Sequence, residues 1–523
     1  MSYLKLEANP DFIWVKLDLK NAFNQIARAA IVENLLSTPV LQHVAWFEAS
    51  VLAPESGLQV KGALWGTAAE GETQGDPKAS FMFNVGIQPQ LRLLDTTLAQ
   101  AGGMARSGMD DVVAGGPAHI LFPALRTFEQ QLQEHCNLQL VRTKTEVFCG
   151  DDDLPEETPA GMVRAGDMVD GQFEAGFVFY GIPMGSDKYV EYKLINKVEE
   201  ITRGAERACK ILAGERQSLW TVLRSSLSQQ FDYWCSLCYP SNVQAVAEQL
   251  DNILWRVLEN AAGFAVPRGE GDRGADHVLE VPVVGLNRRT FQEWVVRLPV
   301  RMGGMGLRSL SDMCLTSFIG AVEQTLPSFP GEGGLCPELS RVFGGLECFG
   351  PNAPVESRWR VLLQSGCRTG RELSGAWTRL QTEAIECCNL LGDVLEGALA
   401  MGVEGIGDGS VSGATRRLIV EQRETLRARV LDKSLSVHHD QAARPVWVWQ
   451  QRDKLSGQWL LSLPGLGSGL VSLVFTESLA SYLCLPSPAC LQRLRERVGR
   501  TTVDPLGRRV ITAALPGDSW RKA

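Results

Sequence analysis

Three aspartates have the spacing that a divalent-metal site requires. Asp18 follows an apolar stretch, and Asp110 is followed directly by Asp111 in a short segment between glycines. Two adjacent carboxylates and a third from another strand can hold two divalent cations about 4 Å apart. Mg²⁺ prefers such oxygen ligands and shares them with substrate phosphates, which makes phosphoryl transfer the chemistry to expect. An Asp-Asp pair by itself is more often a solvated turn, so the pair alone does not decide between the two.

The segments around these aspartates indicate how they would be positioned. Residues 12–19 (FIWVKLDL) are β-branched and aromatic with partial alternation, which predicts a half-buried strand that ends in an acidic residue. Residues 102–116 have glycines on both sides of a short core, which is the pattern of a tight hairpin carrying the two carboxylates. The remaining patterns predict helices over 21–36, 79–94 and 122–136, strands over 138–148 and 177–183, and mostly helical chain over 191–263 and beyond 350.

The composition is that of a soluble globular protein with several domains. The chain has 523 residues, of which 45% are hydrophobic and 21% charged, which excludes a disordered tail, a collagen and a coiled coil. Its 51 Lys and Arg against 60 Asp and Glu give a net charge of −9. This acidic balance argues against nucleic-acid binding by the whole surface, so such binding would need a local basic patch.

Targeting signals and cysteine usage favour an intracellular protein. Residues 1–14 lack the basic start and apolar core of a signal peptide. The longest uncharged window, residues 455–476, contains four glycines and Pro464, so we expect no membrane helix. The 13 cysteines are scattered, as expected for free thiols in a reducing compartment. The single CxxC, Cys235 and Cys238, has no second pair nearby, which favours helix-core cysteines over zinc ligands.

Five motifs between residues 18 and 185 together resemble the palm of reverse transcriptases. In chain order they are Asp18-Leu19-Lys20-Asn21-Ala22-Phe23, Gln74-Gly75-Asp76-Pro77, Met109-Asp110-Asp111, Lys144 within residues 140–145, and Tyr180-Gly181-Ile182-Pro183-Met184-Gly185. The last resembles the primer-grip hairpin of LINE-type (non-LTR) retroelements. The resemblance implies an α+β fold: a polymerase palm, which is an antiparallel sheet with helices on one face, then a helical thumb and a mostly helical C-terminal region.

The resemblance also implies a role for each matched residue. The metal ligands would be Asp18, Asp110 and Asp111, holding two Mg²⁺ ions for which Mn²⁺ could substitute. Lys144 would place a proton or a positive charge near the leaving pyrophosphate. Phe23 would stack beneath the incoming sugar and collide with a 2′-hydroxyl, which favours deoxynucleotides. Template and nucleotide would be positioned by Gln74, Gly75, Asp76 and Pro77, and the primer would be gripped by Tyr180, Gly181, Ile182 and Pro183.

Several of these residues also have a purely structural interpretation. Phe23 would then be a core aromatic on a strand-to-helix turn. Gly75-Asp76-Pro77 would be an ordinary turn before a helix, with Asp76 capping that helix. Lys144 would be a solvated surface lysine.

The local basic patch that the acidic composition calls for lies after the fifth motif. Residues 188–224 contain eight basic and five acidic side chains, a local charge of +3. On a helical wheel one face, interrupted by Glu200, spans about 140°. Its members are Lys193, Lys197, Arg203, Arg207 and Lys210. A polymerase thumb would use such a face to follow the template–primer backbone, whereas the structural alternative is a solvated helix with i,i+4 ion pairs.

The resemblance predicts three regions and also shows departures from the family pattern. We expect a palm over residues 1–190 with the fingers subdomain largely missing, a helical thumb over 191–265, and an extension of unknown role over 266–523. Only 17 residues precede the first motif, so we expect a chain truncated at both ends or a fragment. Gly108 stands where an aromatic residue or alanine is commoner, and Lys78 stands where an apolar residue is usual.

Two functions from different classes follow from the sequence. The first is an RNA-directed DNA polymerase that takes an RNA template, a DNA primer and deoxynucleoside triphosphates; no oligomeric state is predicted. The second is a catalytically inactive retroelement relic or domesticated RNA-binding protein, which the missing fingers favour. A group II intron-type maturase fits less well because no maturase domain is recognisable after the thumb. A viral RNA polymerase fits less well because Phe23 and Gln74-Gly75-Asp76-Pro77 match the reverse-transcriptase side.

Overall fold

The computed structural model shows an α+β chain that divides into two compact units. It describes residues 6, 9–52, 56–61, 63–68, 70–72, 76–150, 153–266, 291–325, 362–363, 366–400, 415–437, 472–483, 497–498 and 501–502. The first unit comprises Met1–Lys193 and Ser328–Thr369, and the second comprises Leu194–Pro327 and Gly370–Ala523. Within the described ranges, no helix is long and apolar enough to cross a membrane.

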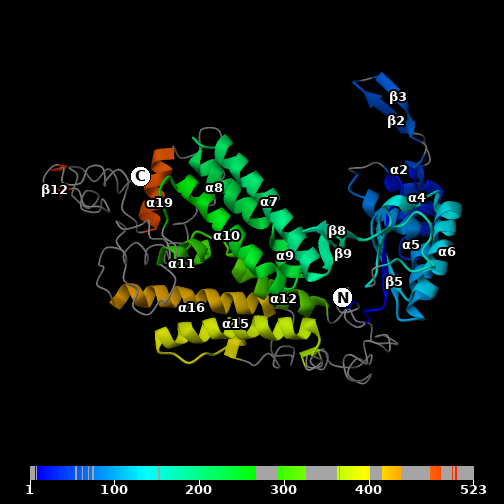
Figure 1. Cartoon of the computed structure of the whole chain (residues 1–523). Coiled ribbons are helices and arrows are strands. Elements are labelled where there is room, and N and C mark those ends of the chain that lie inside the picture. The colour runs from blue at the N-terminus through cyan, green and yellow to red at the C-terminus, as the bar shows by residue number, and fades with distance from the viewer. Residues whose placement is uncertain are drawn as a thin grey trace. The chain divides into compact units, whose positions relative to one another are not determined.

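A five-stranded sheet forms the centre of the first unit (Figure 1). Its strands, in spatial order, are β4 (Met104–Gly108), β5 (Asp111–Gly116), β1 (Ile13–Leu17), β6 (Glu146–Phe148) and β7 (Val163–Arg164). The first four pair antiparallel, but β6 and β7 pair parallel. The expected wholly antiparallel sheet is therefore wrong in this respect: the chain leaves β6, passes through a loop and returns in the same direction, so the sheet is mixed.

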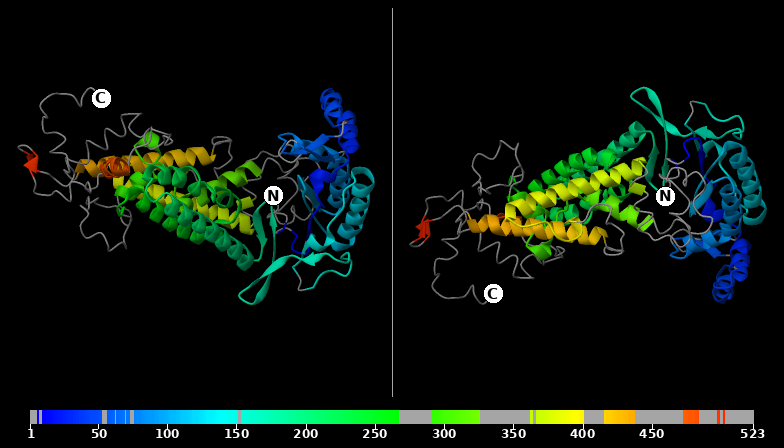
Figure 2. Two further views of the ribbon diagram at one scale, coloured as in Figure 1. Left: turned by 90° about the horizontal axis from the view of Figure 1, so that it is seen from above. Right: turned by 90° about the horizontal axis from the view of Figure 1, so that it is seen from below.

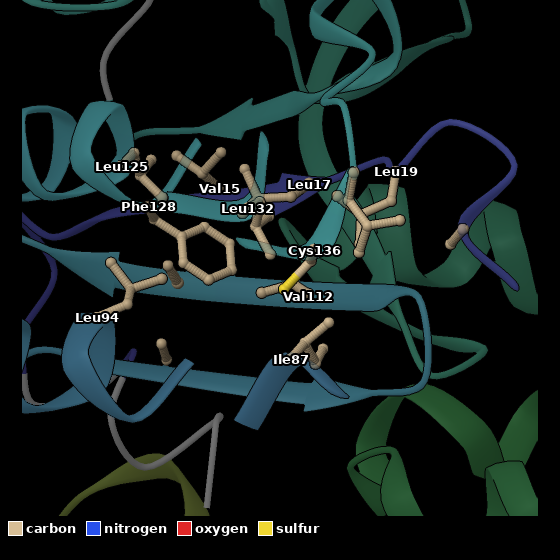
Figure 3. Packing of buried hydrophobic residues seen from close by; sticks show 14 of the residues in the cluster. Val15, Leu17, Leu19, Ile87, Leu94, Val112, Leu125, Phe128, Leu132 and Cys136 are labelled. Atoms are coloured by element: carbon tan, nitrogen blue, oxygen red, sulfur yellow. The ribbon is translucent and has the colours of Figure 1, made fainter. Parts of the chain in front are cut away.

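Alternation along the strands gives the sheet two buried faces. In β1, Val15 and Leu17 enter the larger core, whereas Trp14 points to the opposite face. The larger core is closed by three helices, α3 (Arg28–Ser37), α5 (Ala79–Ala99) and α6 (Ala118–Cys136). Figure 3 shows side chains of α5 and α6 meeting those of β1 and β5 across this core. This packing fixes the register of β1 against β5, because a one-residue slip would turn every side chain to the wrong face.

The opposite face of the sheet meets a second, three-stranded sheet. That sheet has the order β10-β9-β8, formed by β8 (Gly166–Val169), β9 (Gln172–Phe179) and β10 (Ile182–Gly185). A smaller core between the two sheets joins Trp14 and Val113 to Phe177 and Met184. Two further elements, α4 (Gln42–Leu52) and a separate hairpin of β2 (Ser56–Val60) and β3 (Ala63–Ala68), complete the strand-and-helix elements before α5.

Three predicted elements are broken in the structure. The strand expected over 177–183 is interrupted by the two-residue turn Tyr180–Gly181, which separates β9 from β10. The helix expected over 21–36 is divided into α2 (Ala22–Gln25) and α3, because the backbone at Ile26 is extended and its side chain is fully buried. The strand expected over 138–148 is reduced to β6, which follows a 3-10 turn, η1 (Arg142–Lys144). The hairpin expected over 102–116 and the helices expected over 79–94 and 122–136 are confirmed, with α5 and α6 longer than predicted.

The regular elements that the structure describes in the second unit are helices, apart from the short pair β11 (Arg497–Val498) and β12 (Thr501–Thr502). The predicted helical pattern over 191–263 is confirmed. The elements are α7 (Asp187–Ile211), which begins in the first unit, α8 (Arg216–Ser225), η2 (Leu227–Gln229), α9 (Asp232–Leu237), α10 (Pro240–Ala262), α11 (Phe291–Arg297), η3 (Val300–Met302), α12 (Leu310–Thr325), α15 (Arg368–Leu391), η6 (Ala398–Ala400), α16 (Thr415–Val437) and α19 (Ser472–Tyr482). Cys235 in α9 and Cys238 just after it are fully buried, as predicted for core cysteines.

A buried ion-pair cluster joins three helices of the second unit. Arg423 and Arg427 of α16 both pair with Asp312 of α12 and Glu383 of α15. Arg427 is 7% exposed and lies 2.9 Å from Asp312. The helices α15 (yellow) and α16 (orange) run side by side in Figure 1 and in the view from below in Figure 2. Because each charge has an opposite partner, the cluster can be buried without an isolated ion.

Candidate active site

The structure places the three predicted metal ligands at one end of the strand pair β1 and β5. Leu17 is opposite Val112 in the register of these strands, so continuing the register by one residue sets Asp18 opposite Asp111. Residues directly opposite on antiparallel strands project to the same face. This is the face of Lys16, whose ammonium lies 4.0 Å from the Asp111 carboxylate. Asp110 occupies the adjoining turn and is exposed.

The turn that carries Asp110 is a tight two-residue connection between β4 and β5. Gly108 is opposite Asp111, so only Met109 and Asp110 lie between the paired positions. Met109 has a φ of 63°, a left-handed conformation that costs a residue with a Cβ about 1–2 kcal/mol. Its amide donates a hydrogen bond to Asn84 Oδ1 of α5 at 3.1 Å. Helix α5 therefore holds the carboxylate turn in place.

Asn84 is a positioning residue that the sequence patterns did not identify. It lies on the half-buried side of α5, one turn beyond the residues that begin the helix. An amide within an otherwise apolar helical segment is the signal that could have found it. Hydrogen bonding to an orphan amide of a turn is a common use of such a side chain.

The donor chemistry at this edge fits Mg²⁺. Carboxylate oxygens are the ligands that this cation prefers, and two of the three come from neighbouring positions on one face. In the part of the chain that the structure describes, the carboxylates of Asp18 and Asp110 make no hydrogen bond or ion pair. The three carboxylates share an edge of the sheet but are not gathered into one cluster: among the described residues, no three His, Cys, Asp or Glu side chains are grouped closely enough to hold a metal ion.

Phe23 lies in the short helix α2, five residues after Asp18. Asn21, which precedes this helix, has a φ of 43°, so the chain turns sharply between strand and helix. The Phe23 ring is half-buried and stacks on Phe83 of α5, with centroids 4.9 Å apart and planes at 30°. The ring therefore packs against α5 and contributes to the larger core.

Asp76 and Pro77 form the turn that leads into α5. The Asp76 carboxylate accepts a hydrogen bond from the Lys78 amide at 2.9 Å. The N-cap of α5 is Lys78 and no described side chain caps it, so Asp76 closes the turn before the helix and does not cap the helix as its structural interpretation predicts. Lys78 occurs where an apolar residue is usual, and its ammonium is paired with the buried Glu48 at 2.5 Å. The partner accounts for the lysine at this position. Gln74 and Gly75 lie outside the described residues.

Glu72, just before that turn, is a buried acid with an unusual environment. It is 5% exposed, and its Oε1 has no hydrogen-bond partner among the described residues. Burial, which penalises the charged form, raises the pKa of Glu72 above 4.5; Asp76 and Glu48 act in the same direction, while Lys78 and Arg28 oppose it. The raised pKa means that the charged form of Glu72 is disfavoured at this buried position, just before the turn that leads into α5.

Lys144 ends the 3-10 turn η1 and is exposed. The segment before it runs beside the first motif: the Val141 amide donates to the Asp18 carbonyl at 2.8 Å, and the Lys20 amide donates to the Gln139 carbonyl at 2.9 Å. Lys144 therefore belongs to the segment that borders Asp18. Its exposure is that of a solvated lysine in the absence of a substrate.

The predicted primer-grip residues form the tip and second strand of the β9–β10 hairpin. Phe179 is opposite Ile182, so Tyr180 and Gly181 are the two turn residues, with φ values of 49° and 77°. Ile182 and Pro183 begin β10 and are buried. The tip of this hairpin reaches the carboxylate turn, because a Cβ atom added at Gly108 would meet the Tyr180 ring.

The basic face predicted on α7 is only partly available to a ligand. Lys193 pairs with Asp167 of β8 at 2.6 Å, and Lys197 pairs with Glu200 at 2.9 Å. The other three members, Arg203, Arg207 and Lys210, are exposed and make no ion pair with any described residue. A stretch of free positive charge thus lies toward the C-terminal end of the helix.

No family model matches the chain, and no curated protein matches it.

Proposed function

We propose that this chain is the core of an RNA-directed DNA polymerase that adds deoxynucleotides to a primer. The observation that carries the proposal is the edge of the first unit's sheet. There Asp18 and Asp111 take opposite positions on adjacent strands, and Asp110 occupies the turn beside them. Carboxylates from two strands and a tight hairpin are the arrangement that two-metal nucleotide transfer uses. The five ordered sequence motifs support the same assignment.

The chain's own residues would each contribute a physical task. Asp18, Asp110 and Asp111 would hold Mg²⁺, which when bound supplies an activated primer hydroxyl and neutralises charge on the leaving oxygen. Phe23, stacked on Phe83, would limit the space at the nucleotide's sugar. Lys144 would provide positive charge or a proton for the departing pyrophosphate. The exposed cations of α7 would contact the nucleic-acid backbone.

Primer extension tests the proposal. The full chain, an RNA template, a DNA primer, deoxynucleoside triphosphates and Mg²⁺ should give an extended primer. Asp110→Asn should lower the rate about 100-fold or more, because it removes a metal-binding charge. Asp170→Asn is a matched control, since Asp170 is another exposed aspartate in a tight hairpin turn, with a φ of 50°. That variant should retain wild-type activity.

The opposite outcome would favour the other functional class. If the wild-type chain binds RNA but extends no primer with Mg²⁺ or Mn²⁺, an inactive RNA-binding protein becomes the better assignment. An equal loss of activity in both aspartate variants would remove Asp110 from the site.

A further inference from the structure

Helix α2, which carries Phe23, is completed by backbone groups from another segment. It has only four residues, and a single helical turn does not persist without outside support. The Phe23 carbonyl accepts a hydrogen bond from the Glu72 amide at 2.7 Å. The carbonyl of Ile26, just after the helix, accepts one from the Gly71 amide at 3.0 Å. Residues 70–72 therefore hold the end of α2 in place of further helical turns.

Gly71 approaches the backbone of α2 so closely that a side chain does not fit there. Its φ is 69°, the left-handed conformation that glycine adopts without steric cost. A Cβ atom added at this position would lie 2.4 Å from the Asn24 carbonyl carbon and 2.5 Å from the Phe23 carbonyl oxygen. Both are backbone atoms, so neither can turn aside as the end of a flexible side chain could. The contact between residues 70–72 and α2 therefore depends on glycine at position 71.

Arg28, the first residue of α3, fixes the other side of the same segment. Its Nε donates to the Gly71 carbonyl at 3.0 Å, and its Nη1 donates to the carbonyl of Leu52, the last residue of α4, at 2.9 Å. The planar guanidinium holds two acceptors at fixed angles, which a lysine ammonium does not reproduce. Gly71 thus has its amide bonded to the end of α2 and its carbonyl bonded to Arg28, so a shift of the segment moves α2 with it.

Resting on the proposed function, we propose that Gly71 and Arg28 are positioning residues that set the deoxynucleotide preference through Phe23. Neither residue is assigned a contact with the nucleotide itself. The Phe23 ring packs on Phe83 with centroids 4.9 Å apart, and the carbonyl of the same residue is bonded to residue 72, so ring and backbone are held from two sides. Excluding a single hydroxyl group requires the excluding ring to be held within about 0.5 Å. A looser α2 would let the ring yield to a 2′-hydroxyl.

Substitution of Gly71 by alanine tests this role. In primer extension, Gly71→Ala should lower the ratio of kcat/KM for a deoxynucleotide to that for its ribonucleotide about 10-fold, because the new methyl group displaces α2. Gly171→Ala is the matched control. Gly171 also has a positive φ, 80°, but no described atom outside its neighbouring residues lies within 4 Å of a Cβ added there. The control therefore carries the same backbone strain without a collision and should keep the wild-type ratio. An unchanged ratio in Gly71→Ala would overturn the role of Gly71.

A double variant shows whether the effect passes through Phe23. Gly71→Ala should not lower the ratio further in a Phe23→Val background, since the ring that it displaces is already gone, and additive losses would overturn the proposal. Arg28→Lys keeps the charge and one donor, so it tests the same contact if Gly71→Ala does not fold, and it should lower the ratio about 3-fold. Extension by the wild type, with an unchanged ratio in each folded variant, would overturn the positioning role alone. No extension by the wild type would overturn the proposed function and this role together.

Discussion

At the scale of single residues, the carboxylate turn is strained. Met109 takes a positive φ although it has a Cβ atom, and its side chain is 45% exposed. Such a conformation persists only where the surroundings enforce it. Here the Asn84 side chain accepts from the Met109 amide, and the Ser107 hydroxyl donates to the Met109 carbonyl at 2.8 Å. Strain of this kind at an exposed turn is typical of a functional position, which agrees with the role proposed for Asp110.

Phe23 is expected to discriminate deoxynucleotides from ribonucleotides. Replacing it by valine, Phe23→Val, removes the ring that would collide with a 2′-hydroxyl, so the preference for deoxynucleotides should fall roughly 10- to 100-fold. The measurement is kcat/KM for one deoxynucleotide and its ribonucleotide in primer extension. Phe81→Val changes an aromatic residue of α5 that is 49% exposed, and it should leave the preference unchanged. An unaltered preference in Phe23→Val would assign Phe23 to the core alone.

Glu72 is expected to destabilise the folded chain at neutral pH. Because its pKa is raised above 4.5, the folded protein binds more protons than the unfolded chain between the two pKa values. Stability should therefore fall as pH rises through that window. Glu72→Gln removes the charge, so it should raise the melting temperature at pH 7 and make little difference near pH 4. A variant less stable than wild type at pH 7 would contradict this electrostatic account.

At the scale of elements, the sequence predicted those strands and helices whose hydrophobic pattern or turn residues lie within one short segment. The alternation in 12–19, the glycines around the Asp110–Asp111 hairpin and the helical periodicity of α5 and α6 are all visible within one segment. The break at Ile26 is not, because it depends on tertiary contacts: its side chain is fully buried in the core, and the following Ala27 amide donates to the Cys136 carbonyl. The 3-10 turn η1 likewise lies where the alternation of residues 138–148 alone predicts a continuous strand.

In the candidate site, too, the features carried by one segment could be predicted, whereas the contacts between distant segments could not. The aspartates and their order could be predicted, because residue types and spacing carry that information. The ring of Tyr180 against Gly108 could not, since it joins two hairpins distant in sequence. The pairing of Lys193 with Asp167 was missed for the same reason, because a helical wheel does not include charges on another element.

The free cations at the end of α7 are expected to set the salt dependence of nucleic-acid binding. Replacing Arg203, Arg207 and Lys210 by serine should reduce the slope of log Kd against log salt by about 2 to 3, because each phosphate contact releases condensed counterions. Titration of an RNA–DNA duplex at several salt concentrations measures the slope. Lys193→Ser with Lys197→Ser should change it less, since both lysines are already ion-paired. An equal reduction of the slope in the two variants would contradict the distinction between the ion-paired lysines and the other cations of this face.

At the scale of the whole molecule, net charge was a poor guide to the proposed partner. The chain carries −9 overall, yet the free cations of α7 form a local positive surface. Many of the other charges serve the fold. In the second unit, two arginines, an aspartate and a glutamate pair with one another in one buried cluster between helices.

That cluster is expected to contribute strongly to the stability of the second unit. Arg427→Met leaves Asp312 and Glu383 with one fewer counterion in a buried site, which should cost about 3–5 kcal/mol. Arg429→Met, two residues along the same helix, breaks a pair in which the arginine is 53% exposed and should cost less than about 1 kcal/mol. Urea unfolding followed by tryptophan fluorescence compares them. A similar loss of unfolding free energy in both variants would show that the buried cluster stabilises the unit no more than an exposed ion pair does.

If this chain copies RNA into DNA at the edge formed by Asp18, Asp110 and Asp111, the template base must decide which nucleotide is added. The most direct test is single-nucleotide addition on four RNA templates that differ only in the next template base, with each deoxynucleotide supplied alone with Mg²⁺. We expect addition of the complementary nucleotide on each template and none without Mg²⁺. Addition that ignores the template base, or no addition on any template, would contradict it.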